Sequence, residues 1–173
     1  MNRKQKIIIV ESPNESLAIS LALELSNKKR IPFFKDYLLA NKKFDIGESN
    51  NWKIRFYGYY NILQFLEQTR YGAILVNTYV KEYMYTQALN YKTDLESVFD
   101  LDKRYSKLSA HIVGISKENY IDLCVEGNDL VEANYIVMDQ KMKEFLNTTK
   151  CDRTLLDYYD NFEETKKQAL EIL

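Results

Sequence analysis

Histidine, cysteine and long apolar runs are scarce in this sequence of 173 residues. His111 is the only histidine, which excludes catalysis by several histidines and a histidine-rich zinc site. It precedes the apolar run "HIVGI", so we expect it at a strand end or in the core. The cysteines, Cys124 and Cys151, lack C-x-x-C spacing and are expected to be buried thiols. The apolar runs reach about five residues, whereas a bilayer span needs about 20.

An excess of positive charge is also absent, since the formal net charge is −1. This argues against the overall basic footprint of a nucleic-acid-binding protein. One local basic cluster, "NKKRIPFFK" at 27–35, together with Lys42 and Lys43, keeps nucleic-acid binding as the weakest alternative. Hydrophobic residues make up 46% and charged residues 28%, as in a soluble globular domain. We therefore expect one cytoplasmic domain over 1–173. The many Asn, Lys, Ile and Tyr residues indicate AT-rich codons, as in some viral genomes. If the source is viral, the location is the host cytoplasm.

Glycine and proline are few, at 5 and 2, and the chain between them divides into apolar and amphipathic segments. Short apolar runs predict strands at 6–10, 31–35, 73–77, 110–115 and 153–158. Helical periodicity predicts helices at 15–28, 51–72, 79–89, 95–108, 117–126, 129–149 and 161–173. Apolar strands alternating with helices predict an α/β fold with a parallel sheet of about five strands flanked by helices. Ligands of such sheets bind at the carboxyl ends of the strands.

Four segments, in order along the chain, resemble the P-loop nucleoside monophosphate kinases, in particular thymidylate kinase and the phage deoxynucleotide kinases. "IIIVESPNESLAISLALEL" resembles the family's strand, E-G-x-x-x-x-G-K-[ST] loop and helix. "AILVNTYVKEYMY" resembles its strand ending in Asp-Arg, and "HIVGI" the strand before its lid. "LLDYYDNFEETKKQALEIL" resembles its closing strand and helix. The resemblance covers nearly the whole chain and implies the family's fold, with the lid-equivalent region at about 116–130.

The phosphate-binding loop is the part of this resemblance that departs most from the family. The gapless match places six residues on the loop's signature positions: Glu11, Ser12, Glu15, Leu17, Ala18 and Ile19. Only Glu11 agrees. Glycines let backbone N–H groups approach phosphate, the lysine neutralises it and the Ser/Thr holds Mg²⁺. Leu17 adds bulk, Ala18 lacks charge, Ile19 cannot bind metal and Glu15 would repel triphosphate.

These departures predict a pseudokinase with no catalytic residue, no bound metal, no cofactor and no ATP binding. The lid-equivalent stretch "SKENYIDLCVEGNDLVEANY" also lacks the arginines that clamp a transferring phosphoryl group. The alternative function is an active, divergent deoxynucleoside or deoxynucleotide kinase. It would need a replacement cation, and the nearest in sequence, at 28–30, lie roughly 15 Å from the loop by helix rise.

A second, substrate-binding site is implied by the resemblance, between the second strand, the long helix and the end of the third strand. The residues at these places that could contact a base or phosphate are Phe33, Lys35, Tyr37, Arg55, Phe56 and Asn77. An aromatic ring and an arginine suit stacking and phosphate contact. The alternative is that these aromatics belong to the core or to an interface.

The primary prediction for function is a non-catalytic protein that uses the kinase fold to bind other proteins, either an enzyme of nucleotide metabolism, an active paralogue or a host protein. A homodimer is a further option, because related kinases often dimerise through helices. The aromatic helix at 53–70 predicts Tyr59 and Tyr60 as interface residues, since interfaces are rich in Tyr, Trp and Phe.

Overall fold

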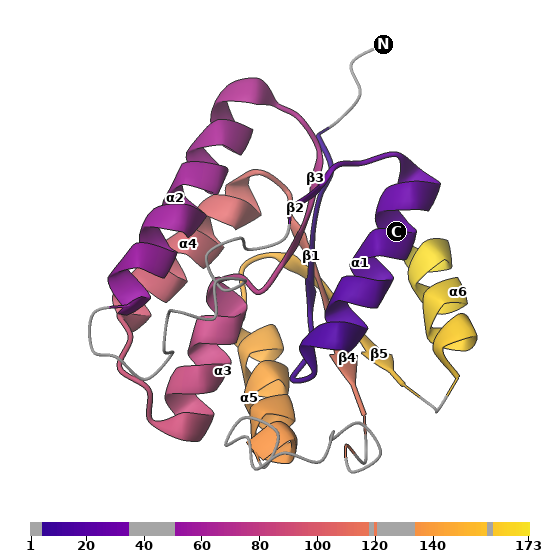
Figure 1. Ribbon diagram of the computed structural model, residues 1–173. Helices are drawn as coiled ribbons and strands as arrows, with labels where there is room; N and C mark the ends of the chain where they lie inside the picture. Colours follow the sequence, from indigo (N-terminus) through magenta and orange to yellow (C-terminus); the bar gives the residue numbers. More distant parts are fainter. Residues whose placement is uncertain (1–4, 35–50, 118–119, 121–133, 159–160) are drawn as a thin grey trace.

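A parallel sheet of five strands forms the centre of the protein in the computed structural model, as the sequence predicts (Figure 1). The structure describes residues 5–34, 51–117, 120, 134–158 and 161–173. The strands are β1 (Ile7–Glu11), β2 (Phe33–Phe34), β3 (Ala73–Val76), β4 (His111–Ser116) and β5 (Asp152–Asp157). Their order in the sheet is β2-β3-β1-β4-β5. β1 therefore lies between β3 and β4, and its carboxyl end adjoins both.

Helices cover both faces of the sheet. They are α1 (Glu15–Lys29), α2 (Asn51–Thr69), α3 (Tyr79–Leu89), α4 (Leu95–Lys107), α5 (Tyr135–Thr148) and α6 (Phe162–Ile172). α1 and α6 pack on one face, and α2 to α5 pack on the other (Figure 1). The side-chain oxygens of Asn14, Thr78, Asp94 and Asn161 cap α1, α3, α4 and α6. These caps satisfy N–H groups that have no partner within a helix.

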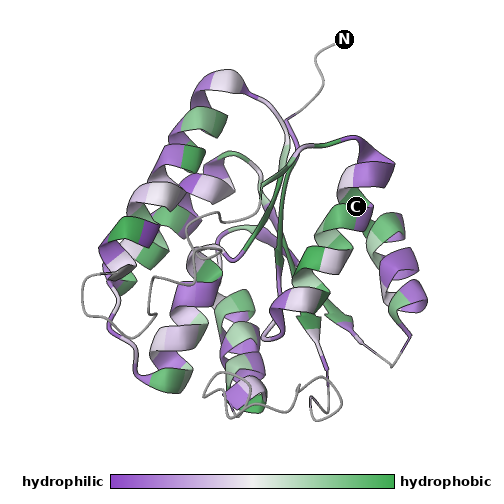
Figure 2. Ribbon diagram, in the orientation of Figure 1, coloured by the Kyte–Doolittle hydropathy of each residue, from purple (hydrophilic) through white to green (hydrophobic). Residues whose placement is uncertain are grey.

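The alternation of side chains along β1 divides the core into two parts. Ile7 and Ile9 face α2 to α5, whereas Ile8 and Val10 face α1 and α6. All four are fully buried, and the strand is apolar up to Glu11 at its carboxyl end (Figure 2). This is the pattern of a parallel strand covered on both faces.

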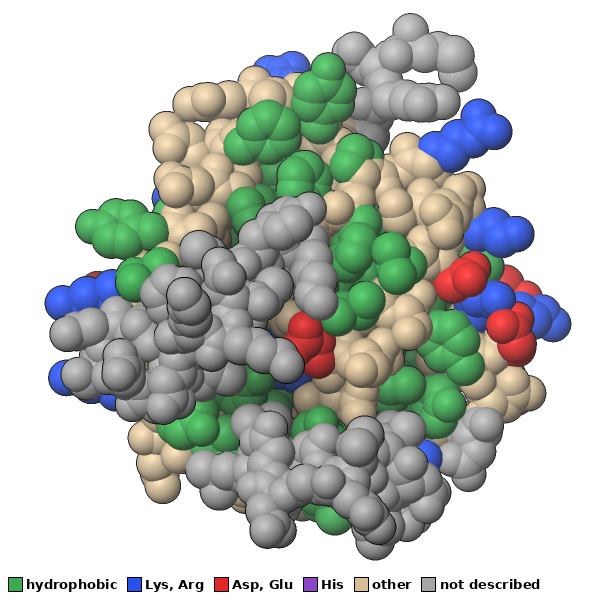
Figure 3. Space-filling model, viewed as in Figure 1, with side chains coloured by type: hydrophobic (Ala, Val, Ile, Leu, Met, Phe, Trp, Pro, Cys, Tyr) green, Lys and Arg blue, Asp and Glu red, His purple; other side chains and the backbone are tan. Residues whose placement is uncertain are grey.

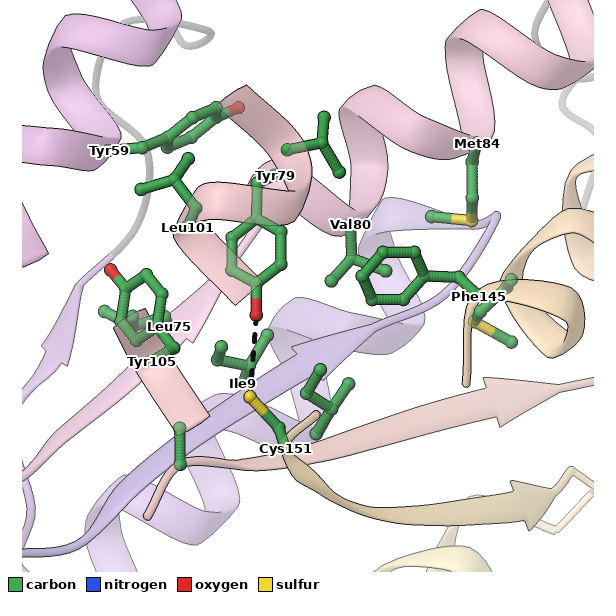
Figure 4. Packing of buried hydrophobic residues seen from close by; sticks show 14 of the residues in the cluster. Ile9, Tyr59, Leu75, Tyr79, Val80, Met84, Leu101, Tyr105, Phe145 and Cys151 are labelled. Atoms are coloured by element: carbon green, nitrogen blue, oxygen red, sulfur yellow. Dashed lines mark hydrogen bonds between the residues drawn. The ribbon is translucent and has the colours of Figure 1, made fainter. Parts of the chain in front are cut away.

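An aromatic cluster fills the larger core, on the α2–α5 side. Tyr79 stacks on Tyr105 with ring centres 5.5 Å apart, and the Tyr79 hydroxyl lies 3.8 Å from the Cys151 sulfur (Figure 4). Asp102 accepts hydrogen bonds from Tyr79, Thr149 and the backbone of Lys150. Burial, with nearby Asp102, raises the pKa of Cys151 to about 12. Cys151 is therefore a buried thiol, as the sequence predicts, and its raised pKa makes it a poor nucleophile.

The sequence-based boundaries agree with the structure in most of the described elements. Helix 79–89 is predicted at its observed bounds, and helix 15–28 ends one residue short of α1. The helix expected at 129–149 is described as α5, Tyr135–Thr148. The helix expected at 117–126, the lid-equivalent region at 116–130 and Cys124 lie mostly or wholly outside the described residues.

His111 starts β4 and is half-buried, with its Nε2 2.8 Å from the Thr154 hydroxyl on the neighbouring strand. It is a strand-end residue, as expected. Among the described residues, none of the helices combines the length and apolar character that crossing a bilayer requires.

Candidate functional site

The turn between β1 and α1 is short, and it places the aligned phosphate-loop residues differently from the sequence prediction. Only Ser12, Pro13 and Asn14 separate the strand from the helix, which begins at Glu15. The Asn14 side chain accepts a hydrogen bond from the Leu17 backbone N–H at 3.2 Å. Leu17 and the residues after it are therefore helical, because this cap starts α1 before the aligned loop would end.

Leu17 and Ala18 do not line the turn with bulk, as the sequence comparison predicts, but pack in the core under α1. Both belong to the apolar cluster between α1 and the sheet, and Ala18 is fully buried. Ile19 is partly buried against the same cluster. Their side-chain directions follow from the helical start at Glu15. The aligned lysine position thus faces the core and not a ligand.

Lys81 supplies a cation to this turn that the sequence analysis missed. It is the third residue of α3. Its ammonium donates to the carbonyl oxygens of Ser12, at 2.7 Å, and Pro13, at 2.8 Å. The ammonium also lies 5.6 Å from the centre of the Tyr85 ring. Only 2% of Lys81 is exposed. The backbone of the turn therefore presents hydrogen-bond acceptors to a buried cation.

Glu11, at the carboxyl end of β1, joins this turn to the start of α3. Its Oε1 accepts from the Thr78 backbone N–H at 2.7 Å and from the Thr78 hydroxyl at 2.8 Å. Burial raises the pKa of Glu11 to about 7, although Lys81 and the Thr78 hydrogen bonds act in the opposite direction. Burial lowers the pKa of Lys81 to about 8, opposed by Glu11 and Glu15. The two groups thus form a buried pair whose charges partly compensate each other.

A second buried ion pair joins α2 to α3. The Arg55 guanidinium binds the Glu82 carboxylate through Nε and through Nη2, the latter at 2.8 Å. The Tyr59 hydroxyl donates to the same carboxylate at 3.1 Å. Arg55 is 4% exposed and Glu82 1% exposed. Such a bidentate pair is well oriented, but its arginine is engaged by its own chain.

Asn77 is the buried polar residue of this region whose side chain is unsatisfied. It follows β3 with a left-handed backbone, φ 54°, and neither atom of its amide has a hydrogen-bond partner among the residues that the structure describes. Within the same part of the chain, Glu11 Oε2 is also without one. The register that pairs Val10 with Val76 places Glu11 and Asn77 on adjacent strand ends. Each such buried polar atom costs about 1–3 kcal/mol, so these atoms call for a physical explanation.

The residues predicted to form a second pocket are only partly brought together. Phe33 packs against the α1 side of the sheet, whereas Arg55 and Phe56 are buried on the α2 side. Lys35 and Tyr37 lie outside the described residues. The cavity between β2, β3 and α2, which Phe34, Tyr59 and Thr78 help to line, measures about 10 Å³. That is room for about one water molecule.

The predicted interface residues on α2 point in different directions. Tyr59 is 5% exposed and its hydroxyl binds Glu82, so it is a core residue. The Tyr60 hydroxyl donates to Asp100, and the ring lies beneath the Arg104 guanidinium. Tyr57 is the outward residue, with 73% of its surface exposed. Tyr59 is therefore inaccessible to a partner, whereas Tyr57 is accessible.

The basic cluster is described only in its first part. Lys28 and Lys29 end α1, and the Lys29 ammonium donates to the Leu170 carbonyl at 3.3 Å. Figure 3 shows one face of the molecule, on which most of the visible described Lys and Arg side chains lie near the edges.

Lys81 and Arg55, the two buried cations of the site, lie in helices, and charged residues of a helix are ordinarily expected on its outer side. The available signal was the position of Lys81 and Glu82 between Tyr79-Val80 and Met84-Tyr85. Apolar residues thus stand on both sides of the charges, which indicates a helix buried nearly all around.

Comparison with solved structures identifies the fold. YorR from Bacillus subtilis, solved in complex with phosphorylated GDP, matches with a TM-score of 0.68 and 16% identity, covering 96% of this chain and 94% of that one. The deoxyadenosine kinase of M. mycoides with bound dATP matches with a TM-score of 0.61 and 15% identity over 97% and 98%. Thymidylate kinase from Ehrlichia chaffeensis gives 0.56 and 9% over 97% and 98%.

The chain has the fold of the P-loop kinases. This confirms the fold that the four sequence segments imply. No protein-family model and no curated protein matches the sequence. At these identities the likeness concerns the fold alone, so activity is argued below from the residues of this chain.

Proposed function

We propose that this protein is a pseudokinase, which uses the P-loop kinase fold for binding and does not transfer phosphoryl groups. The observation that carries the proposal is the turn after β1, where the Ser12 and Pro13 carbonyls bind the Lys81 ammonium. A phosphate-binding loop works in the opposite sense, because its backbone N–H groups face the anion.

The residues of this turn fit a triphosphate poorly. α1 begins with Glu15, whose carboxylate would repel phosphate at the helix N-terminus. The first capping interaction is already supplied by Asn14. Ala18, at the aligned lysine position, is fully buried under the helix. In a kinase of this fold, the residues at these positions give the phosphates of ATP both charge and space. Here the residues at these positions give neither.

A divergent kinase is the second candidate, and Lys81 is the observation that favours it. Its ammonium lies at the turn, which is far closer than the cations at 28–30 at the other end of α1. An ATP phosphate would have to displace two carbonyl contacts and compete with the nearby Glu11 carboxylate. This cost makes the pseudokinase the stronger proposal.

The fold neighbours suggest a class of ligand for the binding role, because their structures hold dATP or phosphorylated GDP. We propose that the present chain binds a small molecule of the nucleoside or nucleotide class at the carboxyl ends of β1 and β3. The buried polar groups gathered there, Glu11, Asn77, Thr78 and Lys81, support this, because buried charges are costly and are concentrated at functional sites.

Protein contacts are the second part of the proposed role, and the outer side of α2 is the surface proposed for them. Ile54, Tyr57 and Phe65 on this helix are 40%, 73% and 42% exposed. Trp52, Lys53 and Tyr60 line an adjoining groove of about 350 Å³. Tyr57→Glu is expected to change the mass measured by light scattering if this surface joins two copies, and Tyr71→Glu, at another exposed tyrosine, is the control. An unchanged mass would remove the homodimer.

Calorimetry with ATP·Mg²⁺, followed by a turnover assay with each deoxynucleoside and its 5′-monophosphate, tests the main proposal. The expected result is no saturable heat from ATP·Mg²⁺ and no ADP formed. ADP formation that Lys81→Met abolishes would establish the divergent kinase instead. ADP formation that survives Lys81→Met would point to a contaminating enzyme, which a second purification step would remove.

A further inference from the structure

β5 is an edge strand of the sheet, on the side of the molecule away from α2 (Figure 1). It pairs with β4 in parallel, in a register that runs from His111 with Asp152 to Ser116 with Asp157. Among the described residues, no strand pairs with its outer edge. An edge of this kind offers a row of backbone donors and acceptors to a further strand.

The outer edge of β5 carries the backbone groups of its odd-numbered residues. Tyr158, directly after the strand, donates its N–H to the Ser116 carbonyl at 2.7 Å, so the even-numbered positions face β4. Successive residues of a strand turn their backbone groups to alternate edges. The N–H and C=O groups of Arg153, Leu155 and Asp157 therefore point away from β4.

The side chains of these odd-numbered residues lie on the α5 face of the sheet. Leu156 packs in the core on the α1 side, so its neighbours along the strand point the opposite way. Leu155, the central one, is 43% exposed. It lines a groove of about 400 Å³ between β5 and α5, together with Arg153, Lys143, Leu146 and Asn147.

Two opposite charges stand at equal distances along the strand from Leu155. Arg153 precedes it by two residues, Asp157 follows it by two, and both are exposed. Charges of one sign on an edge strand would repel a second copy in every register, and edges are commonly protected in this way. Opposite charges instead attract a second copy in one antiparallel register. In that register each Arg153 lies opposite the partner's Asp157, and the two Leu155 side chains meet at the centre.

The neighbouring registers lack this match. A slip of two residues places Leu155 opposite Arg153 in one direction and opposite Asp157 in the other, so a charge faces an apolar side chain. The Asp157 carbonyl accepts from the Thr165 hydroxyl at 3.5 Å, and its second lone pair can accept from a partner strand. Asp157 also has an interaction within its own chain, but a carboxylate offers several acceptor positions, so an arginine can be added.

We infer that the outer edge of β5 is a homodimer interface, where two copies pair in antiparallel fashion through Arg153, Leu155 and Asp157. The two sheets then form one continuous sheet, with the twofold axis between the two Leu155 residues and α5 of both copies on the same face. Such a dimer would form whether or not the protein binds nucleotides, so its test is independent of the proposed function.

Sedimentation velocity of the full chain over a concentration series tests the dimer. One strand of six residues and one helix from each copy make a small interface, so we expect a reversible dimer with a Kd of about 1–100 μM. Arg153→Asp and Asp157→Arg should each weaken it about tenfold or more, because each variant places like charges opposite each other twice.

An equimolar mixture of these two variants provides the decisive measurement. In the mixed dimer an aspartate faces an arginine at both positions, so the mixture should recover the wild-type affinity. A variant that failed to fold could not be rescued in this way. Lys103→Glu, at an exposed position of α4, is the control and should leave the Kd unchanged.

Three results would overturn the inference. A wild type that stays monomeric up to about 1 mM would leave this edge to a strand of another protein. A dimer that Tyr57→Glu dissociates and Arg153→Asp does not would place the contact on α2. Single variants that dissociate but are not rescued by mixing would contradict the register centred on Leu155.

Hydrogen exchange measured by NMR locates the contact on the chain. The N–H groups of Arg153, Leu155 and Asp157 should exchange slowly at high protein concentration and rapidly at low concentration. The N–H groups of Thr154 and Leu156 face β4 and should be protected at both. Exchange of the three outward groups that does not depend on concentration would overturn the assignment to β5.

Discussion

The ammonium of Lys81 lies 2.7 Å from the carbonyl oxygen of Ser12, across the turn that in this fold precedes the first helix. A residue of α3 thereby holds the end of β1, and the contact joins segments 69 residues apart. The same ammonium compensates part of the charge of Glu11. The turn is therefore stabilised by a side chain of α3.

Lys81→Met should destabilise the protein by about 3 kcal/mol, the cost of removing one partner of a buried charged pair. The two carbonyls lose their donor, and Glu11 loses the positive charge that lowers its pKa. Urea unfolding followed by circular dichroism measures the change. Lys103→Met, at an exposed position of α4, should stay within about 0.5 kcal/mol of wild type. Equal stability of the two variants would show that the Lys81 hydrogen bonds merely offset its burial.

Glu11→Gln should remove a pH dependence that the wild type shows. The folded pKa of Glu11, about 7, exceeds the ordinary value of 4.5, so the folded state binds more protons between these pH values. The free energy of unfolding of the wild type therefore falls as pH rises through this window. The free energy of unfolding of Glu11→Gln minus that of the wild type should therefore increase across this window by an amount on the order of 3 kcal/mol. Above the window the difference should stay constant.

The folded pKa of Lys81 in the wild type, about 8, lies above the window, but Glu11→Gln removes a carboxylate that raises it. Lys81 therefore loses its proton at lower pH in the variant, and the low-pH half of the window gives the cleanest comparison. His111 titrates identically in both proteins and cancels in the difference. Glu171→Gln, at an exposed position of α6, is the control and should run parallel to the wild type. A constant difference between Glu11→Gln and wild type across the window would mean that Glu11 ionises normally in the folded protein.

Arg55→Met should cost about 3–5 kcal/mol, because the Glu82 carboxylate would remain buried without its partner. The double variant Arg55→Met with Glu82→Gln should be more stable than Arg55→Met alone. In the double variant, the amide oxygen introduced by Glu82→Gln can still accept a hydrogen bond from the Tyr59 hydroxyl. Thermal and urea unfolding of these two variants, of Glu82→Gln alone and of the wild type give the coupling energy by a double-mutant cycle.

The chain contains a matched exposed pair for comparison. Arg104 on α4 binds Glu67 on α2 with the same two-nitrogen geometry, but the side chains are 32% and 33% exposed. Arg104→Met should therefore cost no more than about 1 kcal/mol. If both arginine variants lose the same stability, burial does not decide the strength of these pairs.

The fold was predictable because each strand and helix carries its own local pattern. The apolar run Ala73–Val76 is short and lies between Gly72 and Asn77, as expected of a strand covered on both faces, and Thr78 begins the next helix as a capping residue should. The site was less predictable, because Lys81 acts on a turn 69 residues away. Local sequence contains no information on that distance.

The first motif shows how two sequence signals can disagree. Helical spacing of Leu17, Leu21 and Leu25 predicts a helix from residue 15, whereas the gapless family match extends the loop through Leu17. The structure follows the helical spacing, since burying these three leucines against the sheet outweighs keeping an empty loop. Of the six aligned residues, Glu11 keeps its side chain at the site and Ser12 contributes its backbone carbonyl.

Restoring the loop lysine by Ala18→Lys should destabilise the protein by more than about 4 kcal/mol, since it forces a charge into a fully packed position. Leu23→Lys on the same helix is the control: Leu23 is 45% exposed, and its loss should cost less than about 1 kcal/mol. Urea unfolding measures both, and calorimetry with ATP·Mg²⁺ follows on any folded variant. A folded Ala18→Lys protein that binds ATP would mean that the first turn of α1 can unwind into a phosphate loop, because only then could a side chain at position 18 leave the core and reach the phosphates.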